Sequence, residues 1–273
     1  MQCYAALHFR YFENVRSIVG ISHGERVKQL QMMNLEISVN RLLQFLSYIP
    51  KLHTLKLICL NTESDKKAQK IAIPADPLPA VENVILIDCG PSVLKIFEVF
   101  PKNSIISFTV RAESFQTLSQ SLQGQKRLKK LSLTCVQSKP IPEDLLMNKK
   151  LSSLTLNLAS QVNLPKFIGR QSKLNYLDVS QMAVEDDTFL KVVKLHELQK
   201  LLINLNAVSL ELLPSIALLK HLKTLMLSGC SRDHLNVLRD IKEFSLENFS
   251  FPSCNESDKK LVDEIKEKCQ TKV

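Results

Sequence analysis

The chain has 273 residues, of which 45% are hydrophobic and 6% aromatic, with a formal net charge of +9. This apolar content excludes a disordered chain and is enough for a long core. No run approaches the roughly 18 apolar residues of a membrane-spanning helix, and Met1 is not followed by the basic start and apolar core of a secretory signal. We therefore expect a cytoplasmic or nuclear protein without a membrane segment.

The beginning of the chain predicts a short helix. Apolar side chains follow helical spacing before Gly20 and Gly24 interrupt the pattern; they are Tyr4, Leu7, Tyr11, Val15 and Ile18. We expect residues 1–24 to form an N-terminal helical cap, because the open end of a repeat core has to be covered.

A six-residue pattern, LxxLxL, recurs along most of the chain. Its four clearest copies begin at Leu151, Leu174, Leu198 and Leu222, at intervals of 23, 24 and 24 residues. Positions four and six of each copy alternate as in a strand, so both point to the same side. One copy cannot bury its leucines alone, whereas stacked copies form a continuous core. Weaker copies begin at Val27, Leu52, Val81, Ile105, Leu128 and Ile241.

Two intervals depart from this spacing. A polar, proline-bearing insertion at residues 61–79 lengthens one interval to 29 residues, and we interpret it as a surface loop, with a function of its own as the less common alternative. The last interval shortens to 19 residues before the copy Ile241-Lys-Glu-Phe244-Ser-Leu246. We expect the repeats to occupy residues 25–252, with helical segments between the strands.

The C-terminal segment, residues 253–273, predicts a capping helix. Ser253-Cys-Asn-Glu256 has the spacing of a capping box. Apolar residues at helical spacing follow it, namely Leu261, Val262, Ile265 and Cys269. A terminal helix with a polar outer face keeps a repeat protein soluble.

The copies, with Cys89, Asn206 and Cys230 at position nine, resemble the leucine-rich-repeat superfamily. The resemblance implies an α/β fold, a leucine-rich-repeat solenoid shaped as a curved horseshoe. About ten parallel strands would line its concave face, and helices would cover its convex face. Such a fold presents a broad surface for a protein partner.

Within this superfamily, the chain is most similar to the substrate-recognition repeats of F-box proteins. The segment from Tyr4 to Val15 resembles the later part of an F-box, in which an apolar helix ends in a basic residue near an aromatic one. The usual Cys of that segment has no clear match, and the earlier F-box helices, which grip a Skp-type adaptor, have no residues here. The resemblance implies a substrate receptor of an SCF-type ubiquitin ligase with an incomplete F-box, which would bind the adaptor only in a longer form. A free-standing scaffold or inhibitor unconnected to ubiquitin remains the alternative.

Motifs for catalysis or metal binding are missing from the sequence. The six histidines stand alone, the seven cysteines form no CxxC pair, and no GxSxG, Walker or GxGxxG motif occurs. Asp186 and Asp187 fall at the expected start of a helix, where carboxylates complement the helix dipole. We expect a protein that is not an enzyme, with no cofactor and no metal, and with reduced cysteines that serve packing.

The candidate binding surface consists of positions two, three, five, seven and eight of each copy, which we expect to face the concave side. The predicted partner-binding residues are Lys130, Thr155, Asn157, Tyr176, Asp178, Lys200, Leu202, Asn204, Thr224 and Met226. An apolar strip among them would combine Leu158, Tyr176, Leu202, Leu205 and Met226. Apolar and aromatic residues among polar neighbours are typical of a protein-binding patch. We expect a monomer that binds a protein there.

Nucleic acid is the less favoured partner. The net charge of +9 attracts acidic molecules at long range. The basic clusters are scattered, however, and only Lys129-Lys130 falls on an expected strand face. No basic groove with interleaved aromatic residues, as single-strand binders use, is visible in the sequence.

Overall fold

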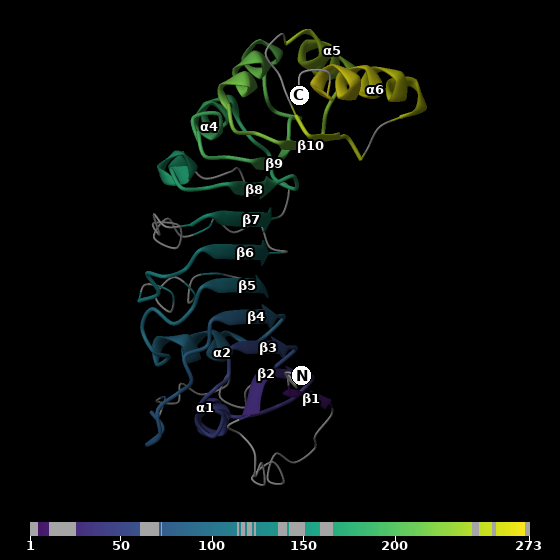
Figure 1. The fold of residues 1–273 in the computed structure, drawn as a ribbon. Helices are drawn as coiled ribbons and strands as arrows, with labels where there is room; N and C mark the ends of the chain where they lie inside the picture. Colours follow the sequence, from purple (N-terminus) through teal and green to yellow (C-terminus); the bar gives the residue numbers. More distant parts are fainter. Residues whose placement is uncertain are drawn as a thin grey trace. The chain divides into compact units, whose positions relative to one another are not determined.

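The computed structural model describes residues 5–10, 26–60, 71, 73–113, 115, 118, 122, 124–135, 141, 151–158, 166–241, 246–252 and 255–270. The chain divides into two compact units, Met1–Lys130 and Leu131–Val273. In each unit, parallel strands lie side by side in the order of the sequence (Figure 1). The α/β leucine-rich-repeat fold class predicted from the sequence is thereby confirmed.

The first unit contains five strands among its described residues. They are β1 (Ala5–Arg10), β2 (Val27–Met33), β3 (Thr54–Ile58), β4 (Asn83–Ile87) and β5 (Ser107–Ala112). The helical segments between them are α1 (Val39–Ser47), α2 (Pro91–Lys95) and the 3-10 segment η4 (Ile96–Glu98). Helix α1 begins where the Ser38 hydroxyl accepts the N–H of Arg41, and it ends at Tyr48, shortly before Pro50.

The second unit continues the same alternation. Its strands are β6 (Lys130–Cys135, whose first residue closes the first unit), β7 (Ser153–Leu158), β8 (Tyr176–Val179), β9 (Lys200–Asn204), β10 (Thr224–Ser228) and β11 (Asn248–Ser250). Its helical segments are η6 (Lys166–Arg170), α4 (Asp186–Val192), η7 (Leu210–Leu218), α5 (Arg232–Asp240) and α6 (Glu256–Gln270).

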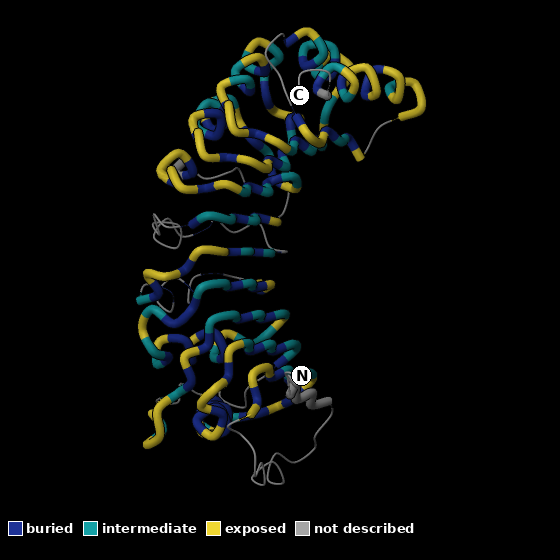
Figure 2. Tube along the Cα trace, in the orientation of Figure 1, coloured by how far each residue is buried: buried dark blue, intermediate teal, exposed yellow. Residues whose placement is uncertain are grey.

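The register of the clear repeats is as predicted. Leu154 pairs with Leu177, Leu177 with Leu201, and Leu201 with Leu225, and each of these side chains is fully buried. The main chain repeats with them. The position-two carbonyl of Asn175 accepts the N–H groups of Gln199 and Lys200 in the next copy. Buried and more exposed residues alternate along β2 to β11 (Figure 2). Each of these strands therefore has one core-facing side and one outward side.

Position eight of the repeats departs from the expectation that it shares a face with positions five and seven. Asn34, Cys59, Asp88 and Gly229 have φ angles of 52°, 50°, 52° and 56°, so the chain turns there into the left-handed region. The N–H of Cys59 donates to the carbonyl of Ile87 over 2.8 Å, which ties this turn to the next strand. Where position eight is apolar, it packs in the core. Leu158 and Leu205 are buried and do not belong to an exposed strip.

The N-terminal helix prediction is wrong for the residues that the structure describes. Ala5–Arg10 is a strand that pairs with β2, with Leu7 opposite Leu30 and Phe9 opposite Met32. Residues 4–9, Tyr-Ala-Ala-Leu-His-Phe, read as a further copy that begins 23 residues before Val27. Over so few residues, apolar side chains satisfy the helical and the strand period equally, and pairing with β2 decides for the strand. The remainder of the predicted cap, residues 11–24, lies outside the described residues.

The last repeat begins five residues later than predicted. Strand β11 places Phe249 opposite Leu225, so that the copy reads Leu246-Glu-Asn-Phe249-Ser-Phe251. Leu246, Phe249 and Phe251 are buried. Glu247 and Asn248 both donate to the carbonyl of Lys223, which repeats the bonding of the earlier copies. The interval from Leu222 is therefore 24 residues rather than 19.

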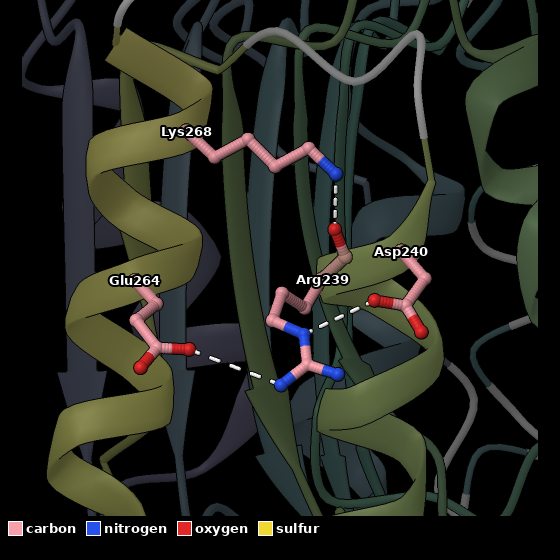
Figure 3. A network of polar contacts seen from close by, with 4 residues as sticks. All are labelled: Arg239, Asp240, Glu264 and Lys268. Atoms are coloured by element: carbon pink, nitrogen blue, oxygen red, sulfur yellow. Dashed lines mark hydrogen bonds and ion pairs between the residues drawn. The ribbon is translucent and has the colours of Figure 1, made fainter.

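The predicted C-terminal helix is present as α6, which packs on α5 and β11. Its buried side chains are those predicted: Leu261, Val262, Ile265 and Cys269. Polar contacts join its surface to α5 (Figure 3). Lys268 donates to the carbonyl of Arg239, whose guanidinium lies 3.9 Å from Glu264 and 3.0 Å from Asp240.

Two further predictions involve residues outside the described ranges. Residues 61–70 and 72 of the predicted surface loop are among them, as are Ser253 and Cys254 of the predicted capping box. In the parts of the chain that the structure describes, no helix combines the length and the apolarity needed to cross a membrane.

Candidate protein-binding surface

The outward face of the second unit is made by strand residues at positions three and five. The position-three row is Ser153, Tyr176, Lys200, Thr224 and Asn248, and the position-five row is Thr155, Asp178, Leu202, Met226 and Ser250. Neighbouring members of a row sit on adjacent strands, about 4.8 Å apart. We call these two rows the outward face of β7–β11.

The predicted site residues divide between the two units. Thr155, Asn157, Tyr176, Asp178, Lys200, Leu202, Asn204, Thr224 and Met226 all lie on β7–β10 of the second unit and are partly or fully exposed. Lys130 is also exposed, but it is the last residue of the first unit and is not grouped with them. Leu202 lies directly opposite both Asp178 and Met226, which brings these three predicted residues into one row.

Tyr176 and Lys200 form the most specific contact of this surface. The two residues are opposite each other in β8 and β9, and Nζ of Lys200 lies 5.5 Å from the centroid of the Tyr176 ring. Partial burial raises the pKa of Tyr176, the nearby Asp178 charge raises it further, and a hydrogen bond with Thr155 opposes the shift. The ring is therefore a neutral, cation-stacked platform at neutral pH.

Side-chain hydrogen bonds hold the rim of the face at the ends of the strands. The carboxylate of Asp178 accepts the backbone N–H of Ser180 over 3.2 Å and its hydroxyl over 2.8 Å. The hydroxyl of Ser228 donates to the carbonyl of Ser180 over 2.7 Å, across β9. Because these bonds fix groups on the repeats of β8 and β10, the outward residues stand on a rigid support.

Charge at the position-two edge is largely compensated. Nζ of Lys223 lies 2.8 Å from a carboxylate oxygen of Glu247, and both side chains are more than half exposed. Exposed pairs of this kind contribute little to stability. The charges that remain on the outward face itself are the Lys200 cation over Tyr176 and the Asp178 carboxylate.

Asp186 and Asp187, the two carboxylates noted in the sequence, have structural roles. Asp186 and Asp187 occupy the first turn of α4, as predicted. The Asp186 carboxylate also accepts the hydroxyl and the backbone N–H of Ser209, over 2.5 and 2.8 Å, and these bonds lower the pKa of Asp186. The Ser209 partner comes from 23 residues away, one repeat later, and no local pattern identifies it.

The two cysteines at position nine behave as packing residues. Burial raises the pKa of the Cys89 thiol to about 11 and that of Cys230 to about 12. Both thiols are therefore protonated and weakly nucleophilic at neutral pH. Within the described ranges, no group of three or more His, Cys, Asp or Glu residues is placed to hold a metal ion.

One set of outward residues escaped the sequence reasoning. Position seven of the first repeats carries Met33, Ile58 and Ile87, which are opposite one another on β2, β3 and β4 and are all partly exposed. We call these three residues the apolar row. Applying the position rule to the weak early copies as well as to the clear late ones would have identified them.

Comparison with known proteins supports the fold alone. No protein-family model matches the chain, and no curated protein matches it. Among solved structures, an internalin from Listeria monocytogenes is similar with a TM-score of 0.52 and 12% identity, over 85% of this chain and 69% of that one. A leucine-rich-repeat protein from Leptospira interrogans is similar with a TM-score of 0.42 and 14% identity, over 90% of this chain and 84% of that one. The similarity to the internalin agrees with the leucine-rich-repeat fold that the strand register shows.

Proposed function

We propose that this chain is a non-enzymatic protein-interaction module that holds a protein partner on the outward face of β7–β11. A repeat fold of parallel strands presents side chains at fixed spacing on a rigid backbone, which suits recognition of an extended surface. The mixed composition of the face, with apolar and aromatic residues among polar ones, supports a protein ligand.

The observation that carries this proposal is the contiguity of Tyr176, Lys200, Leu202 and Met226. Lys200 and Leu202 share β9, Tyr176 stacks against Lys200 from β8, and Met226 lies opposite Leu202 on β10. Aromatic, cationic and apolar groups gathered at the centre of a surface are the usual composition of a binding hot spot.

The test replaces Tyr176, Leu202 and Met226 together with serine. Partner capture by the full chain from cell extract, measured by quantitative mass spectrometry, should lose the partner that the unaltered chain retains. The matched control replaces Glu211, Pro214 and Leu218 with serine. These three residues are exposed, and they lie in η7 and not on the strands of the outward face. Circular dichroism should show both variants folded. Undiminished capture by the serine variant would remove the outward face as the site.

Two roles are compatible with such a module. The resemblance of the segment from Tyr4 to Val15 to an F-box supports a substrate receptor of an SCF-type ubiquitin ligase. The strand at Ala5–Arg10 favours the alternative, a free-standing scaffold or inhibitor. Backbone groups that pair with β2 are committed to the sheet, whereas the resembling F-box segment is helical.

Adaptor binding distinguishes the two roles. We expect this 273-residue chain not to co-elute with a purified Skp-type adaptor. A stable interface requires about 800 Å² from each partner, and β1 is engaged with β2. An F-box protein that binds the same adaptor serves as the positive control. A stable complex in size-exclusion chromatography would instead support the ubiquitin-ligase role.

A further inference from the structure

A second surface stands out in the first unit, at the apolar row of Met33, Ile58 and Ile87. Ile85, at position five of β4, adjoins the row and is also partly exposed. Position three of the same strands is polar, with Gln29, Thr54 and Asn83 in register. In the second unit, position seven is polar as well, with Asn157, Asn204 and Ser228. The apolar row is therefore a local feature and not a general property of the repeat.

Basic residues adjoin this row at one end and along one flank. The strand register places Arg111 opposite Ile87. In the adjoining position-five row, Lys56 lies between Gln31 and Ile85, so that no carboxylate stands opposite it on either neighbouring strand. The patch thus combines an apolar row with positive charge at its Arg111 end and on its Lys56 flank.

Asp88, an acidic residue that follows Ile87, already contacts one of these basic residues, but only loosely. Asp88 lies 3.2 Å from Nε of Arg111, and the two side chains are 47% and 53% exposed. An exposed pair of this kind is worth little in free energy. A ligand carboxylate can therefore replace Asp88 as the partner of Arg111 at small cost.

From this arrangement we propose that the apolar row binds an extended peptide segment of a partner protein, with a run of apolar residues and a carboxylate at the end that meets Arg111. Three strand intervals separate Met33 from Arg111 in the register, a span of about 14 Å. An extended chain rises about 3.3 Å per residue, so a segment of about five residues covers the row. Charge complementarity selects the acidic end, and the row selects the apolar run.

The experiment presents the full chain with a displayed library of random heptapeptides. Enriched sequences should carry a run of apolar residues with Asp or Glu at one end. A synthetic peptide of the enriched class should bind, by fluorescence anisotropy, more tightly than the same peptide with lysine in place of that acidic residue, and more weakly as salt rises. Enrichment of basic sequences, or no enrichment, would overturn the proposal.

Variants locate the binding. Ile58→Glu combined with Ile87→Glu should weaken the peptide by at least about tenfold, as loss of a central apolar contact does. The matched control, Thr54→Glu combined with Asn83→Glu, adds the same charges to the same strands at position three and should change affinity much less. Equal losses in the two variants would show that charge alone acts and would contradict the apolar row.

Two measurements keep other outcomes distinct. If the glutamate pair unfolds the chain by circular dichroism, the milder Ile58→Thr and Ile87→Thr pair takes its place. Sedimentation across a range of concentrations tests whether the row binds a second copy of the chain. A dimer that the Ile58 and Ile87 substitutions dissociate would contradict the peptide proposal. The serine variant at Tyr176, Leu202 and Met226 should still bind the peptide, so failure of this site is separable from failure of the proposed function.

Discussion

The side-chain amide oxygen of Asn204 occupies the space that a Cβ atom on Gly229 would need. The distance from that oxygen to the position of such a Cβ is 2.1 Å, and φ of Gly229 is +56°. Asn204 is held there because the same oxygen accepts the N–H of Asn206 over 2.9 Å. The close approach of β9 and β10 at their ends thus depends on a missing side chain.

Gly229→Ala should therefore destabilise the protein. The left-handed conformation alone costs a residue with a side chain about 1–2 kcal/mol, and the displacement of Asn204 adds to this. Urea unfolding followed by circular dichroism measures the loss. Gly124→Ala is the control, since its added Cβ would meet Lys102 at an ordinary 3.6 Å. Equal stability of the two variants would contradict the close contact with Asn204.

The leucines of the clear repeats should be individually necessary. Leu177→Ala and Leu225→Ala each empty a fully buried site and should lower the free energy of unfolding by about 2–5 kcal/mol. Leu202→Ala, on the outward side of the neighbouring strand, should cost much less. Chemical denaturation of the three variants compares them, and an unchanged midpoint for Leu177→Ala would show that the assigned register is wrong.

The corrected last repeat makes a prediction of its own. Phe249 is buried opposite Leu225, so Phe249→Ala should cost about 3–5 kcal/mol. The adjacent Asn248 is exposed, and Asn248→Ala should change stability by less than about 0.5 kcal/mol. Thermal unfolding distinguishes them. A larger loss at Asn248 than at Phe249 would mean that the strand faces the other way.

Acid should weaken the contact between Asp186 and Ser209. The pKa of Asp186 is lower in the folded protein than its ordinary value because Ser209 donates two hydrogen bonds to the carboxylate. The contact therefore stabilises the folded protein at pH values above the ordinary Asp pKa of about 4. This stabilisation is lost as the pH falls below that value. Asp186→Asn should show a smaller fall in melting temperature over that acidic range than the unaltered chain.

Asp187 provides the comparison for this measurement. It follows Asp186 in the first turn of α4, and it is exposed. Asp187→Asn should leave the steepness of the acid transition close to that of the unaltered chain. If both substitutions flatten the transition equally, the helix start as a whole, and not the Ser209 contact, is responsible.

The sequence alone determined the fold class and the register of the central repeats. The reason is physical: a copy that cannot bury its leucines alone has to stack on its neighbours, so regular recurrence of LxxLxL specifies both the strands and their alignment. Outward positions three and five follow from the same alternation, which is why Tyr176, Lys200, Leu202 and Met226 could be named together. The cation–π contact between Tyr176 and Lys200 is a consequence of that register.

Only the tertiary structure decided the two ends of the array and the strand ends. At Ala5–Arg10 and at Phe249, short apolar patterns suit more than one period or register, and pairing with β2 and β10 selects among them. At position eight, the left-handed turn of Cys59 and Asp88 has no sequence signal as clear as Gly229. The burial of Leu158 and Leu205 at the same position of other repeats was likewise visible only in the structure. The Ser209 partner of Asp186 depends on a contact between repeats, which spacing within one repeat does not encode. The apolar row of Met33, Ile58 and Ile87 instead follows from the position rule once the early copies are aligned with the clear ones.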